Sequence, residues 1–153
     1  MYSINSKRNH IRQAKHDDLG RIAEIEIFNY RLNFYPIFLD DQFYFNDLQV
    51  NHYINQYCDQ LSQYYVYDDG VIKGFIRIQD NEVKKLFVEP VLQNQNIGSQ
   101  LLDYAITYHD VSCLWALEKN KKAISFYEKH GFCKTDIRKL EDDTNEYLVY
   151  LKR

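Results

Sequence analysis

The sequence contains few of the residues that mark special protein classes. Among its 153 residues are only three cysteines, two prolines and one tryptophan. Cys58, Cys113 and Cys133 are odd in number and widely spaced, without a Cys-x-x-Cys pair or a zinc-binding spacing to histidine. We therefore expect free thiols in a reducing compartment, the cytoplasm, and neither a disulfide framework nor a metal site.

Long apolar runs and a strong net charge are also missing. No apolar stretch approaches the roughly 20 residues of a membrane-spanning helix. The net charge of −3 gives no field that would attract nucleic acid or an anionic membrane, so neither is an expected partner. The start, MYSINSKRNH, has no apolar segment behind its basic residues, so we expect a flexible lead-in over residues 1–9 and no secretory signal. The length suits a single domain over residues 1–153.

Aromatic residues, in contrast, are abundant. They make up 16% of the chain and include 14 tyrosines. A core of this size cannot bury so many phenol hydroxyls without partners, so we expect many of them at the surface or around a cavity.

The hydrophobic pattern predicts an alternation of strands and helices. In chain order, the expected elements are a strand (11–14), two helices (16–34 and 41–61), three strands (within 64–90), a helix (97–109), a strand (112–118), a helix (120–130) and a closing hairpin (132–140 with 146–153). We expect the first helix to be broken at Pro36. This order predicts an α/β (α+β) fold with a mixed central sheet.

The junction between the strand that ends at Val88 and the helix that begins at Ile97 has few reactive side chains. Its sequence QNQNIGS includes Asn96 and Gly98, two residue types that tolerate backbone conformations which others avoid. An open helix N-terminus presents unpaired N–H groups and the positive end of the helix dipole to one point. The stretch therefore favours an anion site, with an ordinary polar strand-to-helix connection as the alternative.

A second stretch makes the anion-site interpretation more specific. In LWALEKNKKAISFYEKHGF (114–132), a strand is followed by Asn, two residues, Ala, three residues, Tyr and a closing Gly-Phe. With the loop pattern of Gln93, Asn96 and Gly98, this arrangement resembles the Gcn5-related N-acetyltransferase (GNAT) superfamily, whose members transfer acetyl from acetyl-CoA to an amine. The resemblance covers most of the chain. It implies about seven strands, about four flanking helices and a splayed strand pair that holds acetyl-CoA.

The resemblance also implies roles for individual residues. Tyr127 would protonate the leaving thiolate, since the pKa of a phenol, about 10, lies just above that of a thiol. The residues implied to bind acetyl-CoA are Phe87, Val88, Gln93, Gln95, Asn96, Ile97, Gly98, Ser99 and Asn120.

The acceptor amine must lose a proton before it attacks, and two carboxylates are candidate bases. Glu82, six residues before Val88, and Glu118, on the neighbouring strand, each match a base position found in one branch of the superfamily. We prefer Glu82 because its spacing from the loop motif matches without a gap. A chain of water molecules is the alternative.

The acceptor itself is the least defined part of this interpretation. Aromatic residues between the first two helices would form a wall of the acceptor pocket, or else simply pack the helix pair: Tyr30, Phe34, Tyr35 and Tyr44. The acceptor would be a small molecule or a protein amine, and a homodimer is compatible with the resemblance. A non-catalytic acyl-CoA-binding or protein-interaction module of the same fold is the alternative function, because Asn96 stands where the family pattern has glycine.

Overall fold

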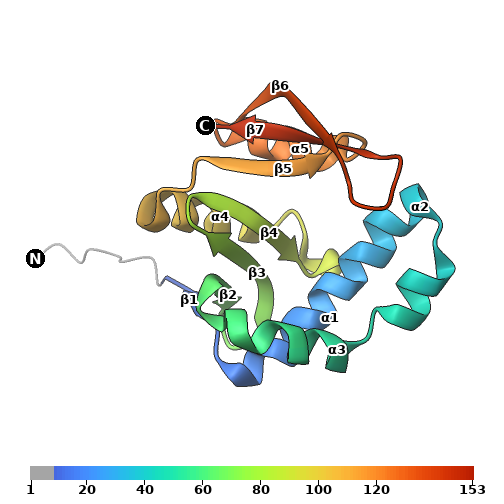
Figure 1. Ribbon diagram of the computed structural model, residues 1–153. Coiled ribbons are helices and arrows are strands. Elements are labelled where there is room, and N and C mark those ends of the chain that lie inside the picture. Colours follow the sequence, from blue (N-terminus) through green and yellow to red (C-terminus); the bar gives the residue numbers. More distant parts are fainter. Residues whose placement is uncertain (1–8) are drawn as a thin grey trace, which may run out of the picture.

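The central feature of the structure, a computed structural model that describes residues 9–153, is a mixed sheet of seven strands (Figure 1). The sheet order is β1-β2-β3-β4-β5-β7-β6. The strands are β1 (Ile11–Gln13), β2 (Tyr64–Asp68), β3 (Ile72–Gln79), β4 (Glu82–Val88), β5 (Cys113–Leu117), β6 (Cys133–Leu140) and β7 (Tyr147–Lys152). Neighbouring strands are antiparallel except β4 and β5, which are parallel. The predicted mixed sheet is confirmed.

Helices cover both faces of this sheet. They are α1 (Leu19–Asn29), α2 (Tyr35–Phe38), α3 (Val50–Tyr57), α4 (Ile97–His109) and α5 (Lys121–Lys129). Buried side chains of α4 and α5 form one core with β3, β4, β5 and β7, while those of α1 and α3 form a second core with β2 and β3. The sheet therefore lies between two helical layers, as Figure 1 shows.

The first helix does not break at Pro36, so that expectation was wrong. A π-type turn over Tyr30–Phe34 joins α1 directly to α2, and Pro36 lies in the first turn of α2. The helical segment instead ends at Leu39, which adopts a left-handed conformation with φ 55°.

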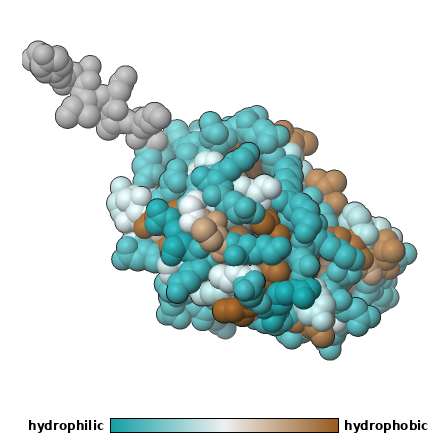
Figure 2. All heavy atoms as spheres, turned by 90° about the horizontal axis from the view of Figure 1, so that it is seen from above, coloured by the Kyte–Doolittle hydropathy of each residue, from teal (hydrophilic) through white to brown (hydrophobic). Residues whose placement is uncertain are grey.

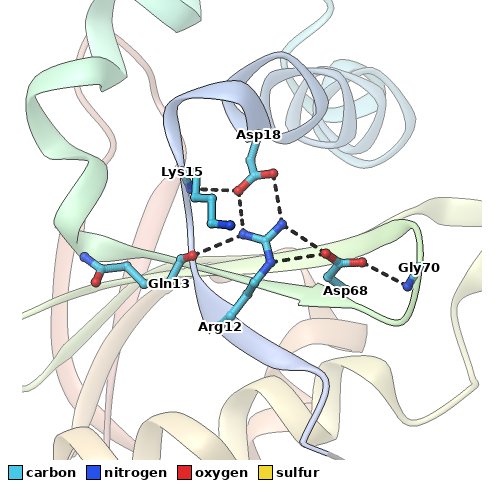
Figure 3. Close-up of polar contacts among 6 residues, drawn as sticks. All are labelled: Arg12, Gln13, Lys15, Asp18, Asp68 and Gly70. Carbon is cyan, nitrogen blue, oxygen red and sulfur yellow. Dashed lines mark hydrogen bonds and ion pairs between the residues drawn. The ribbon is translucent and has the colours of Figure 1, made fainter.

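Arg12 on β1 ties the start of the fold together (Figure 3). Its guanidinium contacts both carboxylate oxygens of Asp18, at 2.7 and 3.1 Å, and one oxygen of Asp68 at 3.0 Å. Asp18 also accepts a bond of 2.7 Å from the Lys15 N–H, and Asp68 accepts one of 2.9 Å from the Gly70 N–H. These bonds fix the approach to α1 against the turn between β2 and β3.

The surface seen from above is mostly hydrophilic, with hydrophobic residues in separate groups (Figure 2). Among the helices of residues 9–153, none combines the length and the apolar character that a membrane span requires. The predicted lead-in lies outside the described residues, apart from Asn9.

Candidate active site

The parallel pair β4 and β5 separates soon after it begins. Only Glu82 with Cys113 and Val83 with Leu114 are paired, although β4 continues to Val88. Beyond Val83, β4 is paired only with β3, so its other edge is open. Unpaired backbone groups of a half-buried strand edge are available to hydrogen-bond a ligand as a further strand would.

The ladder with β3 determines which groups face the open edge. The Glu89 N–H donates to the Lys73 carbonyl on β3 at 2.9 Å. Since hydrogen-bonded pairs alternate along an antiparallel ladder, Phe87 also bonds to β3, whereas Leu86 and Val88 turn their N–H and C=O groups towards the gap.

Two clefts meet at this gap. The larger cleft, of about 610 Å³, lies between the α1–α2 segment, β4, β5 and the β6–β7 loop. The smaller cleft, of about 430 Å³, lies between the end of β4, the loop before α4 and the helix α5. The residues that line both clefts are Phe34, Leu86, Phe87, Asn120, Ala123 and Tyr127. Two molecules that occupied the two clefts would therefore meet beside Tyr127.

Tyr127 is held at this junction by its helix and by two neighbouring rings. It lies on α5, is 9% exposed and packs edge-on against Phe126 and Phe132, with centroid distances of 5.3 and 5.9 Å. Its hydroxyl has no hydrogen-bond partner among residues 9–153. Burial raises the pKa of Tyr127 well above its ordinary value, so the phenol stays protonated at neutral pH.

Asn120 begins the helix that carries Tyr127. Its side-chain Oδ1 accepts a hydrogen bond of 3.2 Å from the Ala123 N–H, which makes it the N-cap of α5. The cap fixes the first turn of α5 beside the gap. The same side chain lines both clefts, so Asn120 has a structural role in addition to its predicted role in binding.

The loop before α4 ends in a helix N-terminus that is open to ligands. Asn94 and Asn96 adopt left-handed conformations, with φ 66° and 63°. The first backbone bond into α4 runs from the Gln100 N–H to the Asn96 carbonyl, at 3.0 Å. The N–H groups of residues 97–99 therefore have no backbone acceptor within the described chain. Together with the dipole of a 13-residue helix, these N–H groups can donate hydrogen bonds to an anion.

Gly98 contributes to this site in a different way from the asparagines. It lies within the first turn of α4, and a Cβ there would meet Phe126 at 3.5 Å and Val88 at 3.7 Å, which are ordinary contact distances. The left-handed backbone conformation that we expected in this loop is thus found at Asn96, as predicted, and also at Asn94, which we did not predict.

Most of the predicted loop residues line the smaller cleft. Those that do so are Gln93, Asn96, Ile97, Gly98 and Ser99, whereas Gln95 does not. Lys122, Lys129 and His130 add basic groups to the same wall. Within residues 9–153, no group of three or more His, Cys, Asp or Glu side chains is placed to hold a metal ion.

Comparison with known proteins relates this arrangement to a family. Residues 60–134 match the family model described as "Acetyltransferase (GNAT) domain". The peptidyl-lysine N-acetyltransferase YjaB of Salmonella typhimurium is 30% identical over 81 residues, which are 50% of this chain and 56% of that protein. The chain belongs to the GNAT superfamily.

Other relatives agree with the GNAT assignment. The peptidyl-lysine N-acetyltransferase YiaC of Escherichia coli is 33% identical over 66 residues, 42% of this chain and 45% of that protein. The chain thus matches about half the length of these curated relatives. The structure of the PaiA N-acetyltransferase of Thermoplasma acidophilum in complex with coenzyme A has the same fold, with a TM-score of 0.65 and 22% identity. The match covers 94% of this chain and 98% of that one.

In this GNAT chain, the two predicted bases are both in ion pairs. Glu82 lies outside the lining of both clefts, and its carboxylate is 3.0 Å from Nζ of Lys84, which lines the larger one. Glu118 is also outside both linings, and its Oε2 is 2.7 Å from a guanidinium nitrogen of Arg138. Neither carboxylate contacts the space beside Tyr127 directly.

The predicted aromatic wall is only partly at the larger cleft. Tyr30 and Phe34 line it and pack against Phe87, with centroid distances of 5.6 and 6.4 Å. Tyr35 does not line it; its hydroxyl instead donates to Asp41 at 2.6 Å. Carboxylates that we did not predict also line this cleft: Asp40, Glu141, Asp142 and Asp143.

A buried ionic cluster beneath the larger cleft was not predicted either. Glu26 on α1 is fully buried, and its Oε1 is 2.6 Å from Nζ of Lys85 on β4. Its Oε2 accepts a bond of 2.8 Å from the Tyr57 hydroxyl, which also contacts Lys85. The sequence places Glu26 in the first predicted helix, but no pattern near Glu26 predicts that it would be buried or that it would pair with a residue 59 positions away.

Proposed function

We propose that this protein is an acetyl-CoA-dependent N-acetyltransferase that acts on a primary amine. The observation that carries the proposal is the open edge of β4 between two clefts that share Tyr127 and Asn120. The acetyl donor would enter from the smaller cleft and the amine from the larger one.

The residues of the smaller cleft fit the donor. The free N–H groups of Ile97, Gly98 and Ser99 suit its pyrophosphate, and Lys122 and Lys129 add positive charge. The gap-facing N–H and C=O of Leu86 and the gap-facing N–H of Val88 suit the amide-containing arm, with Phe87 contributing its side chain. We further propose that Gln93, Asn96 and Asn120 contact the donor.

The chemistry assigned to the chain is proton transfer and orientation. When bound, acetyl-CoA supplies the acetyl group as a thioester that a neutral amine can attack directly. The Tyr127 hydroxyl, which burial keeps protonated, gives its proton to the departing sulfur. Backbone N–H groups of the β4 edge orient the thioester carbonyl and stabilise negative charge on its oxygen.

For the acceptor, we propose an amine that arrives as a cation. Supporting observations are the carboxylates of the larger cleft, its aromatic wall of Tyr30 and Phe34, and the description of two curated relatives as peptidyl-lysine N-acetyltransferases. A lysine side chain in a protein is therefore our first candidate, and a small amine is the second. Glu82 is the base we propose, acting through water because its carboxylate pairs with Lys84 and lies outside the lining of both clefts.

The experiment that tests this function measures release of the coenzyme A thiol from acetyl-CoA with a panel of amines. The panel contains lysine peptides, polyamines and a neutral aromatic amine. We expect release with at least one cationic amine, and a higher melting temperature with acetyl-CoA. Binding without thiol release for any amine would favour the non-catalytic module. Absence of binding at millimolar acetyl-CoA would refute both the enzyme and an acyl-CoA-binding module, and would leave the protein-interaction module.

Three broader predictions accompany the function. We propose that residues 1–153 act as one domain, which limited proteolysis checks. We propose a homodimer, which light scattering checks, and a cytoplasmic location, which fractionation checks. Free thiols agree with that location, because Cys58, Cys113 and Cys133 form no disulfide in the described chain.

A further inference from the structure

Asn29 is a buried polar residue that connects three parts of the candidate site. It lies at the end of α1, is 2% exposed and lines the smaller cleft. Its Nδ2 donates to the Val88 carbonyl at 2.9 Å and to the Ile25 carbonyl of its own helix at 2.9 Å. Its Oδ1 accepts from Nε2 of Gln93 at 3.3 Å. One side chain thus joins α1, the end of β4 and the loop before α4.

The bond to Val88 is made on the edge of β4 that has no neighbouring strand at that point. The Val88 carbonyl faces the gap between β4 and β5, and the β5 pairing ends five residues earlier, at Val83. A half-buried carbonyl at that place needs a donor, and Asn29 supplies it. The amide of Asn29 thereby makes the Val88 carbonyl a weaker site for a further donor at the open edge of β4.

The removal of this acceptor affects how an extended ligand arm can pair with β4. The arm of the proposed donor contains amide N–H groups that seek carbonyl acceptors, and the end of the edge has gap-facing carbonyls at Leu86 and Val88. Because Asn29 already donates to the Val88 carbonyl, the Leu86 carbonyl is the one that has no donor within the described chain and is the better acceptor for the arm. The choice between them shifts the arm by two residues along the strand, about 6.6 Å at the usual rise of about 3.3 Å per residue.

Gln93 is held by the same network. Its Nε2 donates to Asn29, and its Oε1 accepts from Nζ of Lys122 on α5 at 3.2 Å. The loop that leads to the α4 N-terminus is therefore fixed relative to the edge of β4. Its two links leave the backbone N–H groups of residues 97–99 free for an anion.

We propose that Asn29 is a positioning residue that sets the register of the acetyl donor on β4. It does so by occupying the Val88 carbonyl and by holding Gln93, so that the thioester stops beside Tyr127. The proposal rests on the proposed function. Asn29 itself transfers no proton and touches no reacting atom.

The test uses two substitutions in the full chain. Asn29→Asp keeps the shape but places a carboxylate oxygen against the Val88 carbonyl, and Asn29→Ser removes the reach to β4 without adding charge. We expect kcat to fall about 30- to 100-fold, because a small misplacement of a reacting group has effects of this size. The dissociation constant of coenzyme A, measured by calorimetry, should change less than about threefold, since the anion site is intact.

Two measurements separate positioning from a merely structural role. The matched control is Asn81→Asp, the same exchange on the β3–β4 turn outside both clefts, which should leave kcat within about twofold. Melting temperatures of all variants give the folded fraction, to which kcat is normalised. Hydrogen exchange should show faster opening at residues 88–93 in the Asn29 variants only.

The outcomes are distinct. An unchanged kcat per folded molecule with only a lower melting temperature would overturn the proposal in favour of a structural role. A parallel loss of coenzyme A affinity and kcat would overturn it in favour of direct donor binding. If wild-type protein binds coenzyme A but releases no thiol, or binds none, the proposed function fails before any variant is compared.

Discussion

Replacement of Lys85 by methionine tests the buried ionic cluster, because it leaves a fully buried carboxylate without its cation. Glu26 is 0% exposed, and its ion pair with Lys85 spans 2.6 Å. After Lys85→Met, Glu26 keeps only the hydrogen bond from Tyr57. Removing one partner of a buried pair costs about 3–5 kcal/mol, a large part of the roughly 5–15 kcal/mol that stabilises a domain.

The expected size of the effect can be measured by denaturation. For a chain of this length, that loss corresponds to a melting temperature lower by about 6–20 °C, at about 2–4 °C per kcal/mol. Urea unfolding followed by circular dichroism gives the free energy of unfolding directly. The neighbouring variant Lys84→Met is the matched control, since Lys84 pairs with Glu82 at the surface, with side chains 36% and 22% exposed. Such a pair contributes about 0–1 kcal/mol.

A second variant tests whether the unpaired charge of Glu26 causes the loss of stability. Lys85→Met combined with Glu26→Gln removes the buried charge and keeps an acceptor for the Tyr57 hydroxyl. We expect it to recover at least half of the lost free energy. The reasoning is refuted if Lys85→Met costs no more than Lys84→Met, or if the double variant is as unstable as the single one.

Three further predictions follow from single residues. Tyr127→Phe should lower kcat about 100-fold while calorimetry finds coenzyme A affinity nearly unchanged, and full activity would refute the acid role. Asn96→Val should lower the free energy of unfolding by about 1–2 kcal/mol because its φ is 63°, whereas Asn96→Gly should not; urea unfolding compares them. Hydrogen bonds from Arg12 lower the pKa of Asp18 in the folded state. Ionised Asp18 therefore stabilises the fold at pH values above its unfolded-state pKa of about 4, and this stabilisation is lost as the pH falls through the folded-state pKa. Asp18→Asn should therefore destabilise the protein by about 1–2 kcal/mol at pH 7 and flatten the acid limb of its stability curve; equal slopes would contradict this.

The order of strands and helices followed from the sequence because each element depends on neighbours within a few residues. Apolar spacing identified the helix at 97–109, and the Asn120 motif located the next one. The left-handed backbone of Asn96 was anticipated for the same reason, since it is a property of one residue type. Pro36 was misjudged because helix continuation there depends on the π-type turn before it.

Local sequence patterns predicted only part of the candidate site. Sequence identified Tyr127 and Asn120, whose helix faces the gap, but it could not tell that Glu82 would lie outside both clefts or that Tyr35 would turn away from the larger one. Those outcomes depend on strand register and on the docking of α1 and α2.

The residues that only the tertiary structure revealed share one property. Asn29 meets Val88 across 59 positions, and Glu26 meets Lys85 across the same separation. Both contacts arise where α1 packs on β4. The periodicity of a segment shows which face of a helix or strand is apolar. The partner of a buried polar group is set only when two elements that are distant in the sequence pack together, so no local pattern predicts it.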